Sequence, residues 1–435
     1  MKNTPKKTAS GAKSGKARAA PLPWPENVKS MAGSGAVLVV DYHAETEKPL
    51  ELISLNPDKD YVPASILKLV TSAAALVSLG PDYRFKTEFY VDKAKNLWVK
   101  GYGDPYLISE ELCLVAAQLK LKGLSNINKI HVDSSFFEDD MVVDGNSFTN
   151  NPYDAYNTAL GVNFNTVNFL IDSKGEIVES DECSPMTPVA LDLARKIYPK
   201  GKKAKKNVGK KYLNISESPA MALLNTGQFL REILVRKGVI FASEDVVTDQ
   251  VVPRDARLFH RHHSSLNLED MVKELLKYSN NYMTNQIFIT MGAEIYGEPG
   301  NFEKGIKVIQ DFLHEHELPE LKMVEGSGLS RNNAVTARQM AEILRLMEPV
   351  RTIIRSYDDG AFHYKTGTMT DIQTLAGYLE RPGRPDEPLA FVILLNGKYK
   401  QGTREKILDA LKAHLIDEAG TDEPKSAKKQ GRAKG

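Results

Sequence analysis

Residues 63–79 read PASILKLVTSAAALVSL, an almost uninterrupted apolar run that carries one serine–lysine pair. The run starts at Pro63, which suits the first turn of a helix, and it stops before the Gly-Pro pair at 80–81. The pattern therefore predicts a buried helix over 63–79. Because positions i and i+3 share a helix face, Lys68 lies one turn from the Ser65 hydroxyl.

This serine–lysine pair has the composition of an activated nucleophile. A serine hydroxyl is a weak nucleophile until a neighbouring group takes its proton. Lys68 can do so if its aliphatic neighbours in sequence lower its pKa, and the start of a helix favours negative charge on Ser65. The SxxK pattern alone is weak, since it recurs in hydrophilic tails at Ser10 and Ser426. A purely structural serine is the alternative.

A second candidate is the SNN triplet formed by Ser279, Asn280 and Asn281, between helix-like segments at 268–277 and 281–291. A hydroxyl and an amide two positions apart on a turn can point into one cleft. There they can relay a proton and hold a substrate amide. Serines in such patterns usually cap helices or close turns instead. The SxN pattern recurs at Ser54, Ser265 and Ser330.

A third candidate is Lys365-Thr366-Gly367-Thr368, which follows a strand-like run at 361–364 and contains the single KTG of the chain. A cation, a hydroxyl and a glycine on an edge strand suit an anionic substrate. The glycine allows close backbone approach, and an exposed strand can pair with a peptide. A strand that simply runs into a turn is the structural alternative.

The three motifs in this order are far more specific than any one of them, and active-serine penicillin-recognising enzymes share a closely similar trio. The chain resembles the D-alanyl-D-alanine carboxypeptidase/endopeptidase family, the low-molecular-mass class C penicillin-binding proteins. The resemblance covers roughly residues 35–400. It is carried by PASILKLVTSAAAL (63–76), GYGDPYL (101–107), ALGVNFNTVNFLI (159–171), LLKYSNNYMTNQI (275–287), EGSGLSRNNAVTARQM (325–340) and HYKTGTMTDIQTLAGYLE (363–380).

The resemblance implies an α+β fold with a split transpeptidase/β-lactamase-like domain, an antiparallel sheet with helices. We expect this domain at 26–83 and 260–417, with an inserted mixed α/β accessory domain at 84–259. A disordered basic arm at 1–25 and a disordered basic tail at 418–435 complete the predicted organisation. Clustered rather than strictly alternating strands and helices also favour α+β.

The resemblance also implies roles for the first two motifs. Ser65 is the acylated nucleophile and Lys68 its general base. Ser279 and Asn281 take the positions that shuttle the proton and bind the substrate amide. Related enzymes often have Asp where this chain has Asn280, but the middle side chain has no role in that mechanism.

The third motif is implied to bind substrate. Lys365 and Thr366 hold the terminal carboxylate, and Gly367 and Thr368 complete the substrate-binding strand. The backbone N–H groups of Ser65 and Thr368 form the oxyanion hole, a donor pair whose loss typically costs several kcal/mol of transition-state stabilisation.

The implied function is that of a serine-type D-Ala-D-Ala carboxypeptidase, and also a DD-endopeptidase, acting on peptidoglycan stem peptides. β-Lactam antibiotics are the implied covalent inhibitors, and no cofactor or metal is implied. Two alternatives stay open, a serine β-lactamase or esterase of the same fold, and a non-catalytic protein that binds cell-wall peptides. A homodimer also stays open.

The charge composition limits the classes of partner that the protein can bind. The 435 residues carry 57 Lys plus Arg and 56 Asp plus Glu, a net charge of +1, and the length predicts two or three domains. Cations without acids gather in three segments, six in residues 1–20, seven in 200–211 and five in 425–435. The remaining residues are therefore acidic in sum, which argues against a nucleic-acid binder that relies on bulk positive charge.

The sequence predicts no membrane span, because no apolar run approaches the roughly 18–20 residues required. Residues 2–25 have the positive start of a secretory signal without the apolar stretch that follows one. These residues leave two interpretations: either the protein is cytosolic, or its export signal is absent from this chain. Because the resemblance implies a cell-wall substrate, we expect a periplasmic protein.

Other noticeable residues favour structural roles. Cys113 and Cys183 lack metal-site spacing, and two unpaired core thiols are favoured over one bridge between them. The histidine-rich stretch at 260–263 predicts a surface loop rather than a metal site. Asp104 in GYGDP is expected to close a turn, and the lysines of 200–211 to lie in a solvated loop.

The remaining pattern predicts the following elements. Strands are expected at 36–42, 51–55, 87–91, 97–100, 129–132, 167–171, 362–366, 374–380 and 389–395, and further helices at 110–121, 220–237, 336–346 and 401–416.

Overall fold

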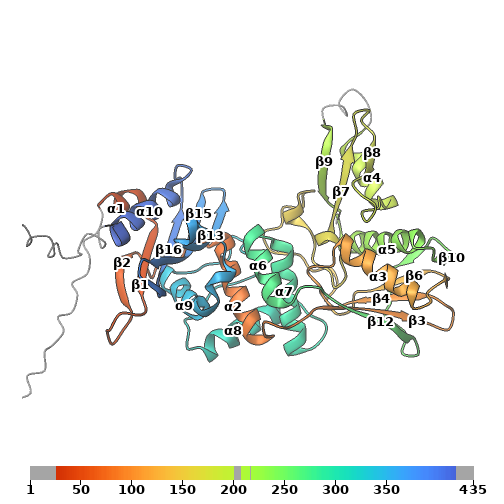
Figure 1. Cartoon of the computed structure of the whole chain (residues 1–435), viewed down its shortest axis with the longest axis horizontal. Helices are drawn as coiled ribbons and strands as arrows, with labels where there is room; N and C mark the ends of the chain where they lie inside the picture. The colour runs from red at the N-terminus through yellow and green to blue at the C-terminus, as the bar shows by residue number, and fades with distance from the viewer. Residues whose placement is uncertain (1–25, 200–206, 216, 418–435) are drawn as a thin grey trace, which may run out of the picture.

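A six-stranded antiparallel sheet forms one end of the molecule (Figure 1). In this computed structural model the described residues are 26–199, 207–215 and 217–417, so the arm and the tail predicted at 1–25 and 418–435 lie outside them. The strand order is β13-β14-β15-β16-β1-β2. The strands are β1 (Ala36–Asp41), β2 (Leu50–Leu55), β13 (Ser356–Tyr357), β14 (Phe362–Met369), β15 (Ile372–Arg381) and β16 (Arg384–Asn396).

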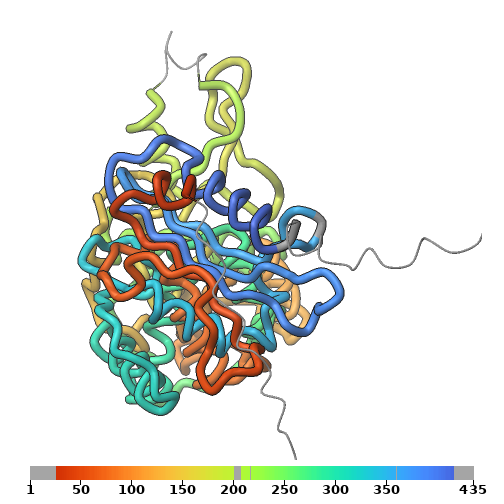
Figure 2. Tube along the Cα trace, turned by 90° about the vertical axis from the view of Figure 1, so that its left-hand side faces the viewer, coloured from red at the N-terminus to blue at the C-terminus, as the bar shows by residue number. Residues whose placement is uncertain are grey.

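Both ends of the chain contribute to this sheet, because β1 pairs with β16, as Figure 2 shows with a red strand beside blue ones. All six residues of β1 are buried, since helices cover both faces of the sheet. Val37 and Val39 face one hydrophobic cluster with α1 and α10, and Leu38 and Val40 face another with α2 and α9. The helices of this part are α1 (Glu26–Ala32), α2 (Lys68–Ser78), α6 (Leu268–Tyr278), α7 (Asn281–Tyr296), α8 (Phe302–Glu315), α9 (Ala337–Met347) and α10 (Thr403–Lys412).

The predicted helix over 63–79 is formed with a different start. Its first turn is a 3₁₀ helix at Ala64–Leu67, and the α-helix α2 begins only at Lys68. Ala64 has a φ of 50°, a left-handed conformation that costs a non-glycine residue of order 1 kcal/mol. The Ser65 turn is thus a strained entry to the helix rather than a regular part of it.

Between α2 and α6 the chain builds a separate α/β part, at the right of Figure 1. A five-stranded sheet, ordered β11-β6-β4-β3-β12, combines parallel and antiparallel pairs and packs against α3 (Ser109–Leu121) and α5 (Pro219–Arg236). A separate two-stranded sheet pairs β10 with β5, the strands that immediately precede β11 and β6 in the chain. Its strands and those of the larger sheet are β3 (Lys86–Val91), β4 (Leu97–Gly101), β5 (Asn126–Ile127), β6 (Ile130–Asp133), β10 (Ile240–Phe241), β11 (Val246–Val247) and β12 (Arg257–His263).

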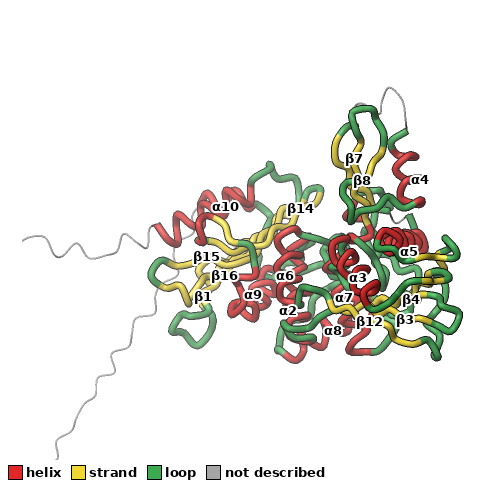
Figure 3. The backbone as a smooth tube through the Cα atoms, turned by 45° about the vertical axis from the view of Figure 1, so that its right-hand side comes forward, coloured by secondary structure: helices red, strands yellow, loops and turns green. Residues whose placement is uncertain are grey.

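A small module projects from this part, as Figures 1 and 3 show. It contains β7 (Thr166–Ile171), β8 (Ile177–Glu179), β9 (Gly209–Asn214) and α4 (Pro188–Ile197), which share their own hydrophobic cluster.

The α+β fold class is confirmed, with an antiparallel sheet and helices as expected. The division into domains stays a proposal. The limit that we placed between residues 259 and 260 falls inside β12, which pairs with β3. Among the described residues no helix is both long and apolar enough to cross a membrane.

Two local predictions are wrong, and a third is wrong only for residues 209–211. Cys113 and Cys183 form a disulfide, because the fold brings their Cα atoms to 6.0 Å across a separation of 70 residues. The histidines of 260–263 lie in β12, where His260 is buried. Of the lysine-rich segment, 200–206 lie outside the described residues, and 209–211 belong to β9. There the backbone pairs with β7 while Lys210 stays exposed.

The turn predicted at Asp104 is confirmed, because its carboxylate accepts a hydrogen bond from the Tyr106 backbone N–H at 2.8 Å. Burial raises the pKa of Asp104 to about 6.

Candidate active site

The structure brings the first two motifs together around Lys68. Its side chain is fully buried, whereas Ser65 is half-buried and so can reach a ligand. Lys68 Nζ lies 3.1 Å from Ser65 Oγ, 2.7 Å from Asn281 Oδ1 and 2.6 Å from the Ser327 carbonyl oxygen. A serine hydroxyl and a buried amine are therefore within hydrogen-bond reach of each other.

The electrostatics around Lys68 favour its neutral form. Burial is the main cause that lowers the pKa of Lys68 well below its usual value, and the charge of Lys365 lowers it further. The Glu325 carboxylate acts in the opposite direction. A neutral amine at this position can accept a proton from Ser65 Oγ.

The SNN triplet forms the tight corner between α6 and α7. Ser279 ends α6 with a φ of 55°, and the Asn280 side chain caps α7 by accepting a hydrogen bond from Met283 N–H. The cap gives Asn280 a structural task that the sequence interpretation did not assign. The corner directs Ser279 Oγ to 2.9 Å from Lys365 Nζ and Asn281 Oδ1 toward Lys68.

Lys365 of β14 is the second buried cation of the site, only 3% exposed. Its Nζ donates to Ser279 Oγ and to the Thr366 carbonyl oxygen, at 2.9 and 2.7 Å. Burial, and then the nearby charge of Arg404, lower the pKa of Lys365 to about 8. Beside it, Thr366 is half-buried and Thr368 is exposed, so both are open to a ligand.

Gly367 lets β14 approach Ser65. A Cβ at this position would lie 2.2 Å from Thr374 Oγ1 and 2.9 Å from the Ser65 backbone nitrogen, so a larger residue does not fit. Thr374 Oγ1 in turn donates to the Pro63 carbonyl oxygen at 2.7 Å, which ties the sheet to the turn that carries Ser65. The KTG strand and the serine turn are therefore one packed unit.

Glu325 is a residue of the site that we missed. It is fully buried, and its carboxylate accepts hydrogen bonds from Ser327 N–H, Ser327 Oγ–H and Gly328 N–H at 2.6–2.7 Å, and from Asn333 Nδ2. This carboxylate fixes the loop whose Ser327 carbonyl contacts Lys68. The glycine- and serine-rich EGSG stretch indicates a tight turn, but not its distant partner.

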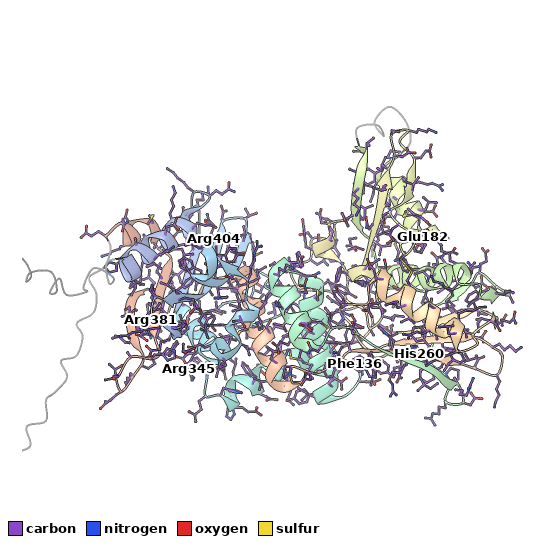
Figure 4. The ribbon with its side chains drawn as sticks, viewed as in Figure 1. Phe136, Glu182, His260, Arg345, Arg381 and Arg404 are labelled. Carbon is purple, nitrogen blue, oxygen red and sulfur yellow. A yellow bond between two sulfur atoms is a disulfide. The ribbon has the colours of Figure 1, made fainter. Side chains whose placement is uncertain are left out.

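Arg404 is the second residue that we missed. It lies near the start of α10 and is labelled beside the six-stranded sheet in Figure 4. Its guanidinium donates to the Gly367 carbonyl oxygen at 2.5 Å and to Thr368 Oγ1 at 2.8 Å. The Gly367 carbonyl and the Thr368 N–H belong to one peptide unit and point in opposite directions. By holding the oxygen, Arg404 fixes the direction of that N–H.

A family model described as the D-Ala-D-Ala carboxypeptidase 3 (S13) family matches residues 31–351. The chain belongs to this family. The match includes Ser65, Lys68 and the SNN triplet and ends before β14, so the KTG residues lie outside it. The resemblance inferred from the sequence is confirmed.

Several known proteins resemble this chain at low sequence identity. A D-alanyl-D-alanine carboxypeptidase of Actinomadura sp. (strain R39) is 26% identical, over 91% of this chain and 84% of its own length. Penicillin-binding protein 4 of Haemophilus influenzae has a TM-score of 0.71 at 19% identity, covering 90% of this chain and 98% of that one. A predatory peptidoglycan endopeptidase of Bdellovibrio bacteriovorus has a TM-score of 0.52 at 16% identity, covering 92% and 95%.

Proposed function

We propose that this S13 protein is a serine-type D-Ala-D-Ala carboxypeptidase that cleaves peptidoglycan stem peptides through an acyl-enzyme on Ser65. The observation that carries the proposal is the 3.1 Å approach of the buried Lys68 amine to Ser65 Oγ. Membership of a carboxypeptidase family supports the reaction class.

In the acylation step, the neutral Lys68 amine takes the proton of Ser65 Oγ as that oxygen attacks the penultimate D-Ala carbonyl carbon. The developing oxyanion is stabilised by the backbone N–H groups of Ser65 and Thr368. The proton passes to the leaving nitrogen by way of Ser279, the C–N bond breaks, and D-Ala departs. Asn281 holds the substrate amide beside Lys68.

In the deacylation step, a water molecule attacks the carbonyl carbon of the Ser65 ester and gives a proton to the amine of Lys68. The ester C–O bond then breaks, and Lys68 returns the proton to Ser65 Oγ, which restores the hydroxyl and the neutral amine. Before acylation, the terminal carboxylate of the intact peptide is bound by Lys365, Thr366 and Thr368. A protonated Lys365 supplies the positive charge for that carboxylate. Gly367 gives this strand its close approach to the reacting serine.

Two further properties belong to the proposal. The enzyme also cuts crosslinks between stem peptides as a DD-endopeptidase, and β-lactams acylate Ser65 and leave slowly. The Haemophilus protein has been solved with a β-lactam and the Bdellovibrio endopeptidase acylated by penicillin G, which supports the same chemistry here.

We also propose a periplasmic location, because the substrate class is found there. The disulfide between Cys113 and Cys183 supports it, since such bonds persist in oxidising compartments.

A Ser65→Ala variant tests the proposal. We expect it to release no D-Ala from purified muropeptides and to lose labelling by fluorescent penicillin, because the attacking oxygen is gone. Ser72→Ala is the matched control, since Ser72 is a buried serine of α2 whose hydroxyl has no partner within the described chain. Labelling of Ser65→Ala equal to wild type would contradict the proposal.

The same preparation separates the alternatives. Rapid, repeated hydrolysis of penicillin without D-Ala release would identify a β-lactamase of this fold, whereas a long-lived adduct fits the carboxypeptidase. Sacculi that yield no released D-Ala and no cleaved crosslinks would favour a protein that only binds cell-wall peptides.

A further inference from the structure

A cavity of about 540 Å³ begins at the SNN corner, and apart from Ser279 and Asn281 the mechanism above uses none of its lining residues. Its walls come from residues 278–281, from the start of α3, from the short segments 152–153 and 163–164, and from the projecting module with the loop that precedes α4. A volume of this size accommodates a ligand as large as a disaccharide. Figure 1 shows that module rising above α3 and α5, and Figure 4 labels Glu182 at its base.

Exposed tyrosines gather at this cavity. All 17 tyrosines of the chain lie among the described residues, and only three of them are exposed. These are Tyr153, Tyr212 and Tyr278, at 52%, 54% and 67%, and all three line the cavity. They come from three separate segments. Large rings kept in solvent around a concave surface mark a binding site for a ligand with an apolar face.

The remaining lining is neutral or acidic. No Lys, Arg or His belongs to the described lining, and the carboxylates of Glu110 and Asp181 do. The side-chain amide of Asn168 lies among them, and its Oδ1 has no hydrogen-bond partner within the described chain, whereas the amide of Asn163 is bonded to Ser109. Lys277 packs against the ring of Tyr278, 4.7 Å from its centre, and does not line the cavity. An anionic ligand would therefore meet unfavourable charge here.

These groups match the chemistry of an N-acetylated sugar. The electron-rich faces of tyrosine rings attract the C–H face of a pyranose, as they attract other positively polarised edges. Carboxylates accept hydrogen bonds from sugar hydroxyls, and asparagine amides pair with acetamido groups. A stem peptide alone, with its several carboxylates, suits this lining less well.

The walls are held in place without a ligand. Ser184 Oγ lies 3.2 Å from Ser109 Oγ, which also accepts a hydrogen bond from Asn163 Nδ2 at 2.7 Å. Between Asp181 and Ser184, Cys183 is bonded to Cys113 of α3. A pre-formed wall lowers the entropic cost of binding.

We propose that this cavity is a saccharide subsite that binds the N-acetylated glycan strand while its attached stem peptide reaches Ser65. The inference rests on the proposed function for its substrate, but the binding itself does not depend on catalysis. It assigns to the accessory part the task of recognising the sugar to which the peptide is linked.

The first test measures binding of a neutral probe, N,N′-diacetylchitobiose, by saturation-transfer NMR. We expect wild type and Ser65→Ala to bind it, and Tyr212→Ala and Tyr153→Ala to bind about tenfold more weakly, the loss of one stacking contact. Phe148→Ala is the matched control, because Phe148 is an aromatic residue of the accessory part that is 67% exposed but outside the cavity. Equal binding by wild type and both tyrosine variants would overturn the subsite. So would displacement of the probe by a sugar-free pentapeptide, which would identify a peptide site.

The second test compares a pentapeptide linked to its disaccharide with the free pentapeptide. We expect wild type to process the linked form with about tenfold higher kcat/KM, and Tyr212→Ala to lose this preference while keeping the rate on free peptide. Equal rates on both substrates in wild type would overturn the inference and leave the proposed function intact. Inactivity on both substrates, with chitobiose still bound, would instead contradict the proposed function alone.

Discussion

Two buried lysines at the centre of the site have different surroundings. Lys68 has its pKa lowered by full burial and by the charge of Lys365, whereas the pKa of Lys365 is lowered only to about 8. The lowered pKa suits the first amine for the role of base, and at neutral pH the second keeps most of its charge. When their surroundings give two amines different pKa values, one amine can serve as the base and the other can bind a carboxylate.

The pH profile follows from this difference. Because Lys365 loses its proton as the pH rises through about 8, we expect kcat/KM on a stem peptide to fall with a midpoint about there. Arg404 contributes to lowering that pKa, so Arg404→Gln should move the alkaline limb to higher pH. Its removal also frees the Gly367 carbonyl and should lower the maximal rate.

The control for charge is Arg345→Gln on α9, which removes an exposed ion pair with Glu342. We expect its alkaline limb to coincide with that of wild type. An unmoved limb in Arg404→Gln, measured over the same pH range, would refute the link between Arg404 and Lys365.

Ser65 and Lys68 could be found from the sequence because helical spacing alone makes them neighbours. The third contact of Lys68 could not, since the Ser327 carbonyl lies 259 residues away. Arg404 likewise acts through the distant Gly367 carbonyl, and Glu325 holds a local loop whose Ser327 carbonyl meets Lys68 from far along the chain. No spacing rule reports such contacts, and they exist only once the sheet, the loop and the helices have packed.

At the scale of elements, the loop at 325–330 and the serine turn fit together through one glycine. Gly328 has a φ of 82°, and a Cβ there would lie 1.9 Å from the Ala64 carbonyl oxygen. Ala64 immediately precedes Ser65. Any side chain at Gly328 must therefore displace either the turn that carries Ser65 or the loop whose Ser327 carbonyl contacts Lys68.

Gly328→Ala should consequently damage catalysis more than folding. We expect kcat/KM to fall about 100-fold, the usual effect of an ångström-scale displacement of reacting groups. Gly80→Ala is a matched control, because Gly80 has a similar φ of 84° but nothing within 4 Å of its Cβ. Both variants lose about 1 kcal/mol of unfolding free energy to backbone strain. Comparable activities of the two in a D-Ala release assay would contradict the steric explanation.

Helices and strands could be predicted where their apolar residues form a continuous or regularly spaced pattern in the sequence. The strands of the large sheet are continuous apolar runs, so β1 and β16 were expected close to their observed positions. The polar strands β9 and β12 were not, because their pairing partners, and not their own side chains, make them strands. Helix α8 was overlooked although its apolar residues do recur at helical spacing.

At the scale of the whole molecule, the six-stranded sheet and the accessory part have hydrophobic clusters of their own, and a smaller cluster joins Phe136 and Phe137 of the accessory part to Ile289 of α7. The family resemblance implied the split fold, in which an early serine–lysine motif and a late KTG strand belong to one domain. The bond between Cys113 and Cys183 could not be foreseen, since their spacing resembles no disulfide framework and only the packing of the projecting module on α3 places them together.

This disulfide closes a loop of 70 residues within the accessory part, so its removal should act there first. Chain-entropy arguments give about 4 kcal/mol of lost unfolding free energy for a loop of this length. We expect the double variant Cys113→Ser/Cys183→Ser to unfold at a lower urea concentration than wild type. The fluorescence of Trp98 measures this unfolding. That residue stacks on His131 in the five-stranded sheet, and a Trp24→Phe background makes it the sole reporter.

Penicillin labelling of Ser65 at the same urea concentrations reports the catalytic sheet separately. Because the two clusters are distinct, labelling should persist where the Trp98 signal has already changed, and the gap should be wider in the cysteine variant than in wild type. Coincident transitions of both signals in wild type and variant would show instead that the two parts unfold as one cooperative unit, and that the bond stabilises the entire chain.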